Sequence, residues 1–410
     1  MRLSDFVEFN PKVKLSHDLD YPYVEMDEII PGRRYVRGRL LRPFAGGGTK
    51  FQRDDVLFAR ITPCLENGKI AQFRNPNFQQ GFGSTEFFIF RAKENISDPG
   101  YVFYLFSDAE IRQIAEKSMV GASGRQRANI NSLHNFERDF PPLPIQRKIA
   151  AILSAYDDLI ENNTRRIAIL EEMARAIYQE WFVRFRFPGH ENARMVPSPL
   201  GGEMPEGWEV VKLGDIASQS KVQVNPAKQP EKIYSHYSFP AFDTGKLPLS
   251  EVGSAILSNK FSVPSRTILL SKMNPQIKRL WLVGTTSKNA VASTEFLVLQ
   301  ALSPVTHVFL YCLLDSERFQ SAFTSLALGT STSHQRVSPD AVLKINVLQP
   351  DSVIIKRFTE NVLPMFEQID SLKLKNANLR RTRDLLLPKL VAGEIDVSGM
   401  DIEVAQIDLV

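Results

Sequence analysis

The sequence predicts an α+β protein: two homologous globular α/β domains separated by two long helices that form an antiparallel coiled coil, with pseudo-twofold symmetry. Two observations predict this fold class. The same short segments occur in the same order in both halves of the 410-residue chain. Each half also ends in a long stretch whose apolar residues are spaced as in a coiled coil.

Two pairs of matching segments show the repeat. Ser-Thr-Glu-Phe occurs at residues 84–87 and again at residues 293–296. Upstream of it, the apolar run at residues 56–63 matches residues 268–275. Matches that keep their order at a nearly constant separation indicate two copies of one fold with different loop lengths.

Each copy is predicted to contain strands, then a helix, then a polar loop. Apolar runs bounded by Gly, Pro and Asn predict strands, at Val56–Ile61, Phe87–Phe90, Thr267–Met273 and Phe296–Leu299. One helical stretch follows in each copy, at Tyr101–Met119 and at Val308–Ala327. A loop rich in Gly, Ser and Thr comes next, at residues 121–127 and 329–336.

Both copies end in a predicted coiled-coil helix, in which seam residues recur at steps of four and three. The seam of the first helix, Ile145–Phe182, is predicted at Ile145, Ile149, Ile152, Tyr156, Leu159, Asn163, Arg166, Leu170, Met173 and Ile177. That of the second is predicted at Phe358, Val362, Met365, Ile369, Leu372, Asn376, Leu379, Arg383, Leu386 and Leu390. Pro364 is expected to shorten or bend the second helix near its start.

Asn163 and Asn376 occupy matching seam positions. In antiparallel helices these two side chains would meet and fix the register of the pair. The alternative is that each helix packs against its own domain and the asparagine points to solvent.

These patterns divide the chain into six segments. They are a first globular domain (1–143), a central helix (144–187), a Pro/Gly-rich linker (188–207), a second globular domain (208–351), a C-terminal helix (352–392) and an acidic tail (393–410).

Composition excludes several classes of protein. Net charge is +4 and the sequence pI is about 8.9, which permits a polyanionic partner without requiring one. Cys64 and Cys312 are far apart, so free thiols in a reducing compartment are expected. The N-terminus lacks the apolar stretch of a signal peptide, and no run approaches the roughly 18 apolar residues of a membrane span. The chain is therefore predicted to be cytoplasmic.

Motifs for catalysis are not recognised. Residues 139–143 contain Pro-Pro but do not fit the Asp/Asn-Pro-Pro-aromatic motif of a methyltransferase. Residues 46–50 are glycine-rich but lack the spacing of a phosphate-binding loop. The six histidines show no metal-ligand spacing. The chain is expected to be no enzyme and to need no cofactor or metal.

Four helical and linker segments resemble one known family, the specificity subunits of type I restriction–modification systems. Residues 141–158 and 174–183 resemble the central conserved region of that family. Residues 202–209 (Gly-Glu-Met-Pro-Glu-Gly-Trp-Glu) resemble the start of its second recognition domain, and residues 379–395 resemble its closing helix. The first copy lacks the Pro-Glu-Gly-Trp that precedes the second.

The resemblance covers essentially the whole chain and implies a division of labour. Each globular domain is expected to read one half of a bipartite target in double-stranded DNA. The helices are expected to set the spacing of the half-sites and to dock methyltransferase subunits, two in number. Restriction and translocase subunits would join through the complex. The target sequence, the gap length and the stoichiometry of the complex do not follow from the sequence.

Candidate DNA contacts lie in two places in each copy, where Arg, Lys, Asn and Gln can read bases and smaller polar groups can bind phosphates. The polar loops supply Ser123, Arg125, Gln126 and Arg127, and Ser331, Thr332, His334, Gln335 and Arg336. The strand ends supply Arg60, Thr62 and Lys69, and Lys272, Asn274, Gln276, Lys278 and Arg279. The alternatives are a solvated loop and ordinary surface charge. Thr85-Glu86 and Thr294-Glu295 are expected to hold turns rather than to contact DNA.

Two other functions compete with DNA recognition. A protein-binding assembly scaffold would bind DNA weakly and without dependence on salt, whereas neutralising phosphates makes affinity fall steeply with salt. An enzyme such as an unusual nuclease would cut or modify DNA without partner subunits.

Overall fold

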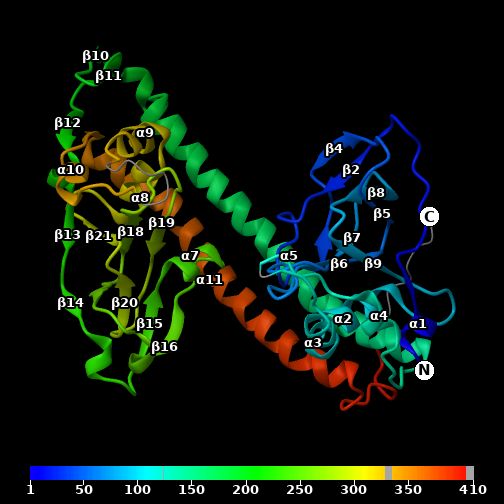
Figure 1. Cartoon of the computed structure of the whole chain (residues 1–410). Coiled ribbons are helices and arrows are strands. Elements are labelled where there is room, and N and C mark those ends of the chain that lie inside the picture. The colour runs from blue at the N-terminus through cyan, green and yellow to red at the C-terminus, as the bar shows by residue number, and fades with distance from the viewer. Residues whose placement is uncertain (123, 328–334, 403–410) are drawn as a thin grey trace. The chain divides into compact units, whose positions relative to one another are not determined.

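The computed structural model describes residues 1–122, 124–327 and 335–402 (Figure 1). The chain divides into two compact units. Unit 1 comprises Met1–Asn163 and Lys375–Val410, and unit 2 comprises Thr164–Leu374. Both long helices contribute residues to both units, α5 (Leu143–Tyr178) and α11 (Ser352–Val391).

The described residues of unit 1 form two β-sheets and four short helices, besides their parts of α5 and α11. The first sheet has the strand order β1 (Val7–Phe9), β9 (Phe87–Ala92), β6 (Val56–Ala59), β7 (Ile70–Phe73), β3 (Tyr35–Val36). The second has the order β4 (Leu40–Pro43), β2 (Asp20–Val24), β8 (Gln80–Gly83), β5 (Thr49–Gln52). The helices are α1 (Leu3–Phe6), α2 (Pro99–Ser107), α3 (Ala109–Lys117) and α4 (Ile130–His134).

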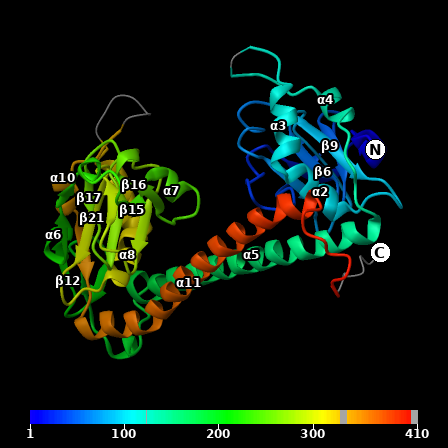
Figure 2. The same ribbon diagram turned by 90° about the horizontal axis from the view of Figure 1, so that it is seen from below.

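The first sheet of unit 1 is covered on both faces, which explains why its central strands are almost wholly apolar. On β6, Leu57 belongs to the cluster that joins the two sheets, whereas Val56 and Phe58 belong to the cluster on the helical side. Helix α2 packs against β6, β7 and β9 on that helical side (Figure 2). Leu153 from α5 and Leu390 from α11 complete the same cluster.

In unit 2, the part of the chain that the structure describes forms two sheets of the same kind. The first has the strand order β13 (Ala217–Ser220), β21 (Phe296–Ala301), β18 (Thr267–Ser271), β19 (Leu280–Val283). The second has the order β14 (Gln223–Val224), β17 (Lys260–Ser262), β20 (Ala290–Ser293), β15 (Ile233–Tyr237), β16 (Leu249–Val252). Two further strand pairs are β12 (Glu209–Lys212) with β22 (Asn346–Gln349), and β10 (Met195–Pro197) with β11 (Glu203–Pro205).

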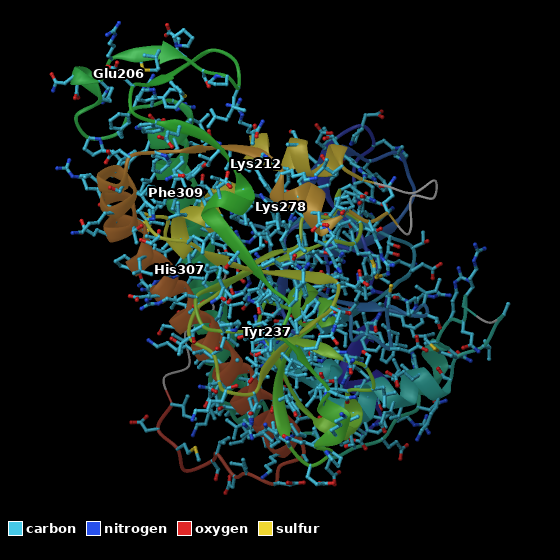
Figure 3. All side chains as sticks on the ribbon, turned by 90° about the vertical axis from the view of Figure 1, so that its left-hand side faces the viewer. Glu206, Lys212, Tyr237, Lys278, His307 and Phe309 are labelled. Carbon is cyan, nitrogen blue, oxygen red and sulfur yellow. The ribbon has the colours of Figure 1, made fainter. Side chains whose placement is uncertain are left out.

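The helices of unit 2 pack around an apolar cluster. They are α6 (Leu213–Ile216), α7 (Phe239–Asp243), α8 (His307–Asp315), α9 (Glu317–Ser325) and α10 (Pro339–Leu343), with short 3-10 helices η2 (His190–Asn192), η3 (Pro226–Lys228) and η4 (Gly253–Ala255). Phe309, labelled in Figure 3, lies in this cluster with Tyr178 and Phe358. Tyr178 precedes a π-helical turn, η1 (Gln179–Val183), which continues α5.

The same strand order in both units confirms that the chain contains two homologous globular domains. The order β1-β9-β6-β7 in unit 1 corresponds to β13-β21-β18-β19 in unit 2. Likewise, β4-β2-β8-β5 corresponds to β16-β15-β20-β17. The helical stretch predicted as one helix in each copy is two helices. Asp108 and Ser316 separate them, and each caps the helix that follows, by accepting from the backbone N–H of Glu110 (2.9 Å) and Phe319 (3.4 Å).

The two long helices run antiparallel. Within unit 1, Asp157 of α5 contacts Arg383 of α11, and Asn163 contacts Asn376, so residue numbers rise along one helix as they fall along the other. Asn163 Nδ2 donates to Asn376 Oδ1 over 2.9 Å, and Asn376 is buried. The two asparagine side chains therefore meet at one level of the seam.

Two details of the helices differ from the sequence prediction. Pro364 does not shorten the second helix, because α11 begins at Ser352 and continues through the proline. The predicted seam of α5 is wrong at Leu159 and Met173, which are 52% and 46% exposed, and at Arg166, which is also exposed. The neighbouring residues Ile160 and Ala174 are buried instead. This face also packs against the globular cores, which shifts the buried stripe by one residue.

A buried polar network joins both long helices to the globular part of unit 1. The side chains of Asp157 and Arg383 form an ion pair and are only 5% and 9% exposed. Tyr104 Oη donates to Asp157 Oδ2 (2.6 Å), and Arg383 Nη1 also donates to the carbonyl of Gly32 (3.0 Å). Burial raises the pKa of Tyr104 well above its ordinary value, so its hydroxyl remains a donor.

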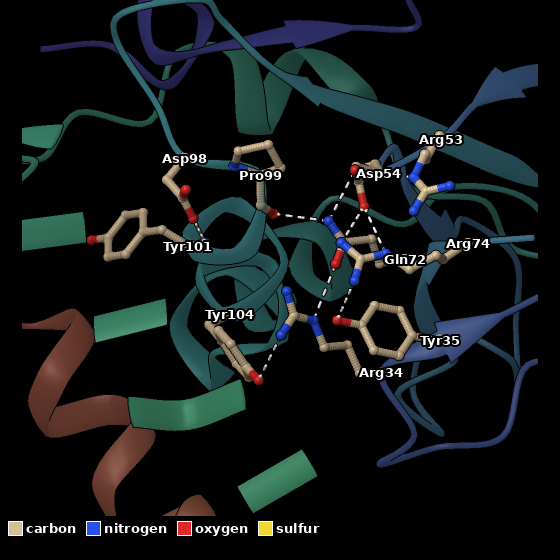
Figure 4. Close-up of polar contacts among 10 residues, drawn as sticks. All are labelled: Arg34, Tyr35, Arg53, Asp54, Gln72, Arg74, Asp98, Pro99, Tyr101 and Tyr104. Atoms are coloured by element: carbon tan, nitrogen blue, oxygen red, sulfur yellow. Dashed lines mark hydrogen bonds and ion pairs between the residues drawn. The ribbon is translucent and has the colours of Figure 1, made fainter. Parts of the chain in front are cut away.

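Arg34 extends this network into the first sheet (Figure 4). Its Nε donates to Gln72 Oε1 (3.0 Å) and its Nη1 to Tyr104 Oη (3.4 Å). The guanidinium also lies 4.8 Å from the ring centre of Tyr35, a cation–π distance. The buried charges of this network are thus matched by partners, as burial of charge requires.

Replacing Asp157 by Ala is expected to lower the free energy of unfolding by about 3–5 kcal/mol, because Arg383 would remain buried without its carboxylate. Urea unfolding followed by circular dichroism measures the change. Trp181, Trp208 and Trp281 all lie in unit 2, so tryptophan fluorescence should shift less. The exposed neighbour Asp158, replaced by Ala, is the control. Equal destabilisation by both substitutions would contradict the structural role of the ion pair.

Candidate nucleic-acid interface

Three segments of unit 1 meet where strand β6 ends. The backbone N–H of Arg60 donates to the carbonyl of Glu86 (3.0 Å), in the turn before β9. The N–H of Thr62 donates to the carbonyl of Gln126 (3.0 Å), and the N–H of Ala128 donates to the carbonyl of Arg60 (2.8 Å). These bonds fix the chain on either side of the polar loop to the end of the sheet.

Unit 2 repeats this arrangement where β18 ends. The backbone N–H of Lys272 donates to the carbonyl of Glu295 (2.9 Å). The N–H of Asn274 donates to the carbonyl of Gln335 (2.8 Å), and the N–H of Val337 donates to the carbonyl of Lys272 (3.0 Å). Each bond has its counterpart in unit 1.

We call these two clusters the strand-end sites. The first consists of Arg60, Thr62, Glu86, Gln126 and Arg127, and the second of Lys272, Asn274, Glu295, Gln335 and Arg336. Every member except the two glutamates was predicted as a DNA contact, so the structure brings together the loop and strand-end candidates of each copy.

Arg127 is held at the base of its loop by backbone and side-chain bonds. Its backbone exchanges two hydrogen bonds with Val120 (2.9 and 3.0 Å). Its Nε donates to both carboxylate oxygens of Glu86 (3.1 and 3.0 Å), and its Nη2 donates to Oε1 (2.6 Å). The Arg127 side chain is still 44% exposed, whereas that of Glu86 is 22% exposed.

The charge of Glu86 is stabilised by two cations. Its hydrogen bonds to Arg127 lower the pKa of the carboxyl group, and the nearby charge of Arg60 adds to the effect. Arg60 Nε lies 3.7 Å from Glu86 Oε2, and the Arg60 guanidinium lies 5.0 Å from the ring centre of Phe88. Glu86 is therefore ionised at neutral pH.

The second strand-end site contains the equivalent ion pair. Arg336 Nη2 donates to Glu295 Oε1 over 3.1 Å, and the Arg336 side chain is 62% exposed. Its backbone forms a β-bridge with Met273, as that of Arg127 does with Ile61. Among the described residues, Arg336 makes one side-chain hydrogen bond to Glu295 where Arg127 makes three contacts with Glu86, so Arg336 is less constrained.

The other predicted residues lie apart from these clusters or make different contacts. Lys69 Nζ donates to the carbonyl of Met26 (2.7 Å), Arg279 pairs with Asp243 (3.0 Å), and Lys278, labelled in Figure 3, pairs with Asp315 (2.5 Å). Arg125 and Gln276 are exposed. Four candidates lie outside the described residues: Ser123, Ser331, Thr332 and His334.

Each unit also has a cavity where its two packed helices meet a long helix. The cavity of unit 1, about 370 Å³, is lined by Asp108, Arg112 and Arg383 among others. That of unit 2, about 410 Å³, is lined by Arg175 and Asp315 among others. Most of the charged groups at these cavities form ion pairs within the protein, as Arg383 does with Asp157 and Arg175 with Asp315. These ion pairs join neighbouring helices.

Within the described ranges, no group of three or more His, Cys, Asp and Glu side chains is placed to hold a metal ion. The same ranges contain no helix with the length and apolar character needed to cross a membrane. Cys64 and Cys312 are both free thiols.

Sequence reasoning assigned Glu86 and Glu295 to turns and missed their ion pairs. The turn role is present, since their backbone N–H groups donate to Ser84 Oγ (3.2 Å) and Ser293 Oγ (3.3 Å). The carboxylates, however, also hold the two loop arginines. A usable signal was the recurrence of Glu and Arg together at matching positions of both copies.

Comparison with known proteins gives consistent relatives. Residues 2–172 match the family of type I restriction modification DNA specificity domains. The type I restriction enzyme MjaIX specificity subunit of Methanocaldococcus jannaschii is 28% identical, over 93% of this chain and 85% of the relative. The HindI specificity subunit of Haemophilus influenzae is 24% identical, over 84% of this chain and 87% of the relative.

A solved structure supports the likeness of fold. It is the crystal structure of the type I restriction–modification S subunit from M. genitalium, 15% identical in sequence. The match covers 95% of each chain with a TM-score of 0.57, which shows a common fold.

Replacing Glu86 by Gln is expected to leave the stability of the fold almost unchanged, because its partner Arg127 is exposed to solvent and ion pairs at the surface contribute little. The midpoint of urea unfolding measures this. It should stay close to that of the wild type, in contrast to the Asp157→Ala variant. A large shift would mean that Glu86 is needed to hold the sheet end together.

Proposed function

We propose that the chain is a specificity subunit of a type I restriction–modification system, as its similarity to such subunits supports, and that it recognises a bipartite sequence in double-stranded DNA. In this proposal the globular domains, residues 1–143 and 208–351, each read one half-site. The long helices, residues 144–187 and 352–392, set the distance between the half-sites. The linker at 188–207 and the tail at 393–410 take no part in reading.

The observation that carries this proposal is the duplication of the strand-end site. Each site presents an exposed arginine beside a glutamine, Arg127 beside Gln126 and Arg336 beside Gln335. Arginine is the side chain that most often reads guanine, and glutamine can read adenine, because each matches two groups on one base edge. Two equivalent sites in one chain suit a target with two half-sites.

The remaining candidates are assigned to the DNA backbone or to structure. Arg125 is exposed on the first loop and is proposed to contact phosphate, as are Thr62, Asn274 and Gln276. Lys278 already has an acidic partner, which reduces the charge that it offers to DNA. Four loop positions outside the described residues, Ser123, Ser331, Thr332 and His334, remain proposed contacts, as do Lys69, Lys272 and Arg279.

The spacer role rests on the seam of the antiparallel helices. A shift of one helix along the other would separate Asn163 from Asn376 and leave the buried amide of Asn376 without this partner. We propose that this pair fixes the register and with it the half-site spacing. We also propose that the helices dock methyltransferase subunits and that the chain itself carries no catalytic activity.

Removing each loop arginine is expected to damage one half-site only. In a complex with the methyltransferase subunits, Arg127→Ala and Arg336→Ala should each weaken binding to the cognate duplex by about 5- to 150-fold, the value of a bidentate base contact. Methylome sequencing of a host that carries each variant shows which half of the motif becomes degenerate. Lys278→Ala is the control, and equal loss on every sequence would identify the arginines as phosphate contacts.

Binding should also depend strongly on salt. If about 6–10 phosphates are neutralised, affinity should fall by roughly 10³- to 10⁵-fold between 50 and 200 mM salt. Fluorescence anisotropy with a labelled duplex measures this dependence. A weak, salt-insensitive interaction would favour the assembly scaffold instead, and cutting or methylation by the chain alone would indicate an enzyme.

A further inference from the structure

We propose that Glu86 and Glu295 are positioning residues that present Arg127 and Arg336 to a guanine in each half-site. This inference rests on the proposed DNA recognition and adds to it the identity of one base on each side. Its starting point is the ion pair that occurs at the same place in both strand-end sites.

The first step concerns the donors that Arg127 has left. A guanidinium carries five N–H donors in one plane. Glu86 accepts from Nε and from one side of Nη2, so the two N–H groups of Nη1 and the second N–H of Nη2 point away from the carboxylate. This outer edge offers two parallel donors.

The second step concerns the base that this edge fits. Guanine presents two adjacent acceptors, O6 and N7, in the major groove, whereas adenine presents one acceptor and one donor. The outer edge of the Arg127 guanidinium carries donors only. It therefore matches the two acceptors of guanine, whereas the amino group of adenine would place a donor against a donor.

The third step distinguishes a base from a phosphate. Phosphate is an anion, and the ionised carboxylate of Glu86 lies directly behind the guanidinium. Its charge opposes a phosphate at that position, whereas the edge of guanine carries no net charge. The carboxylate thus favours base contact over backbone contact.

The fourth step concerns rigidity. The backbone of Glu86 is bonded to Arg60 and Ser84 at the start of β9, so the carboxylate is fixed to the sheet. The backbone of Arg127 is paired with Val120 at the base of the loop. The guanidinium is therefore positioned by the sheet rather than by the loop beyond it, as precise recognition requires.

The second copy makes a graded comparison possible. Within the described part of the chain, one side-chain hydrogen bond of 3.1 Å joins Arg336 to Glu295, and Arg336 is more exposed than Arg127. We expect a less constrained arginine to discriminate less strongly. The effect of removing the carboxylate should therefore be larger for Glu86 than for Glu295.

The test combines altered DNA with altered protein, and uses the full chain in complex with methyltransferase subunits. Each guanine of the recognised motif is replaced in turn by 7-deazaguanine, which lacks N7 but still pairs with cytosine. One guanine in each half-site is expected to weaken binding by about 5-fold, the value of one hydrogen bond. If no such guanine exists in either half-site, the inference is wrong.

The protein variants are Glu86→Gln and Glu295→Gln. Glu86→Gln should reduce the preference for G·C over A·T at the first of these positions by about 5-fold or more, without changing the salt dependence. Glu295→Gln should do the same, more weakly, in the other half-site. The control is Glu137→Gln, which breaks another exposed pair of unit 1, with Arg2.

The outcomes separate this inference from the proposed function. If the wild-type complex selects no bipartite motif, the proposed function fails. If it selects one but Glu86→Gln keeps full discrimination, only the inference fails. If Glu86→Gln tightens binding equally to every duplex, Arg127 contacts phosphate. The 7-deazaguanine measurement uses wild-type protein and holds even if a variant misfolds.

Discussion

Neither globular core is complete without both long helices, and this sharing is the constraint on which the rest of the structure depends. The helical side of the unit 1 core includes Leu153 from α5 and Leu390 from α11. That of unit 2 includes Tyr178 from α5 and Phe358 from α11. Burying these side chains stabilises each core, so a change in the pairing of the helices would lower the stability of both domains.

The two units hold their portions of the long helices by different chemistry. Unit 1 uses a satisfied polar network around Asp157 and Arg383, in which the loss of one partner is costly. Unit 2 uses an aromatic cluster instead, in which Phe182 contacts both Phe309 and Phe358, with ring centres 5.0 Å apart in each case. A duplicated fold therefore does not imply duplicated interactions, even though the strand order is the same.

Sequence reasoning predicted the repeat, the long helices and the loops that meet the strand ends, because each of these leaves a local pattern. The centre of the α5 seam was missed at Leu159 and Met173, since spacing gives the period of a buried stripe but not which neighbour faces the core. The pairing of Glu86 with Arg127 was also missed, because it joins residues that only the folded sheet brings together. Candidates such as Ser331 and His334 lie outside the described residues and stay predictions.

The pre-formed contact between Glu86 and Arg127 has a thermodynamic consequence. A free arginine side chain carries about 2 kcal/mol of rotamer entropy, which must be lost when it docks on a base. Because the Arg127 side chain is already ordered by Glu86 in the folded protein, much of this entropy is lost on folding. Less of it is then lost on binding DNA. A wrong base is then rejected by leaving donors without acceptors, because the side chain has little freedom to swing away and find other partners.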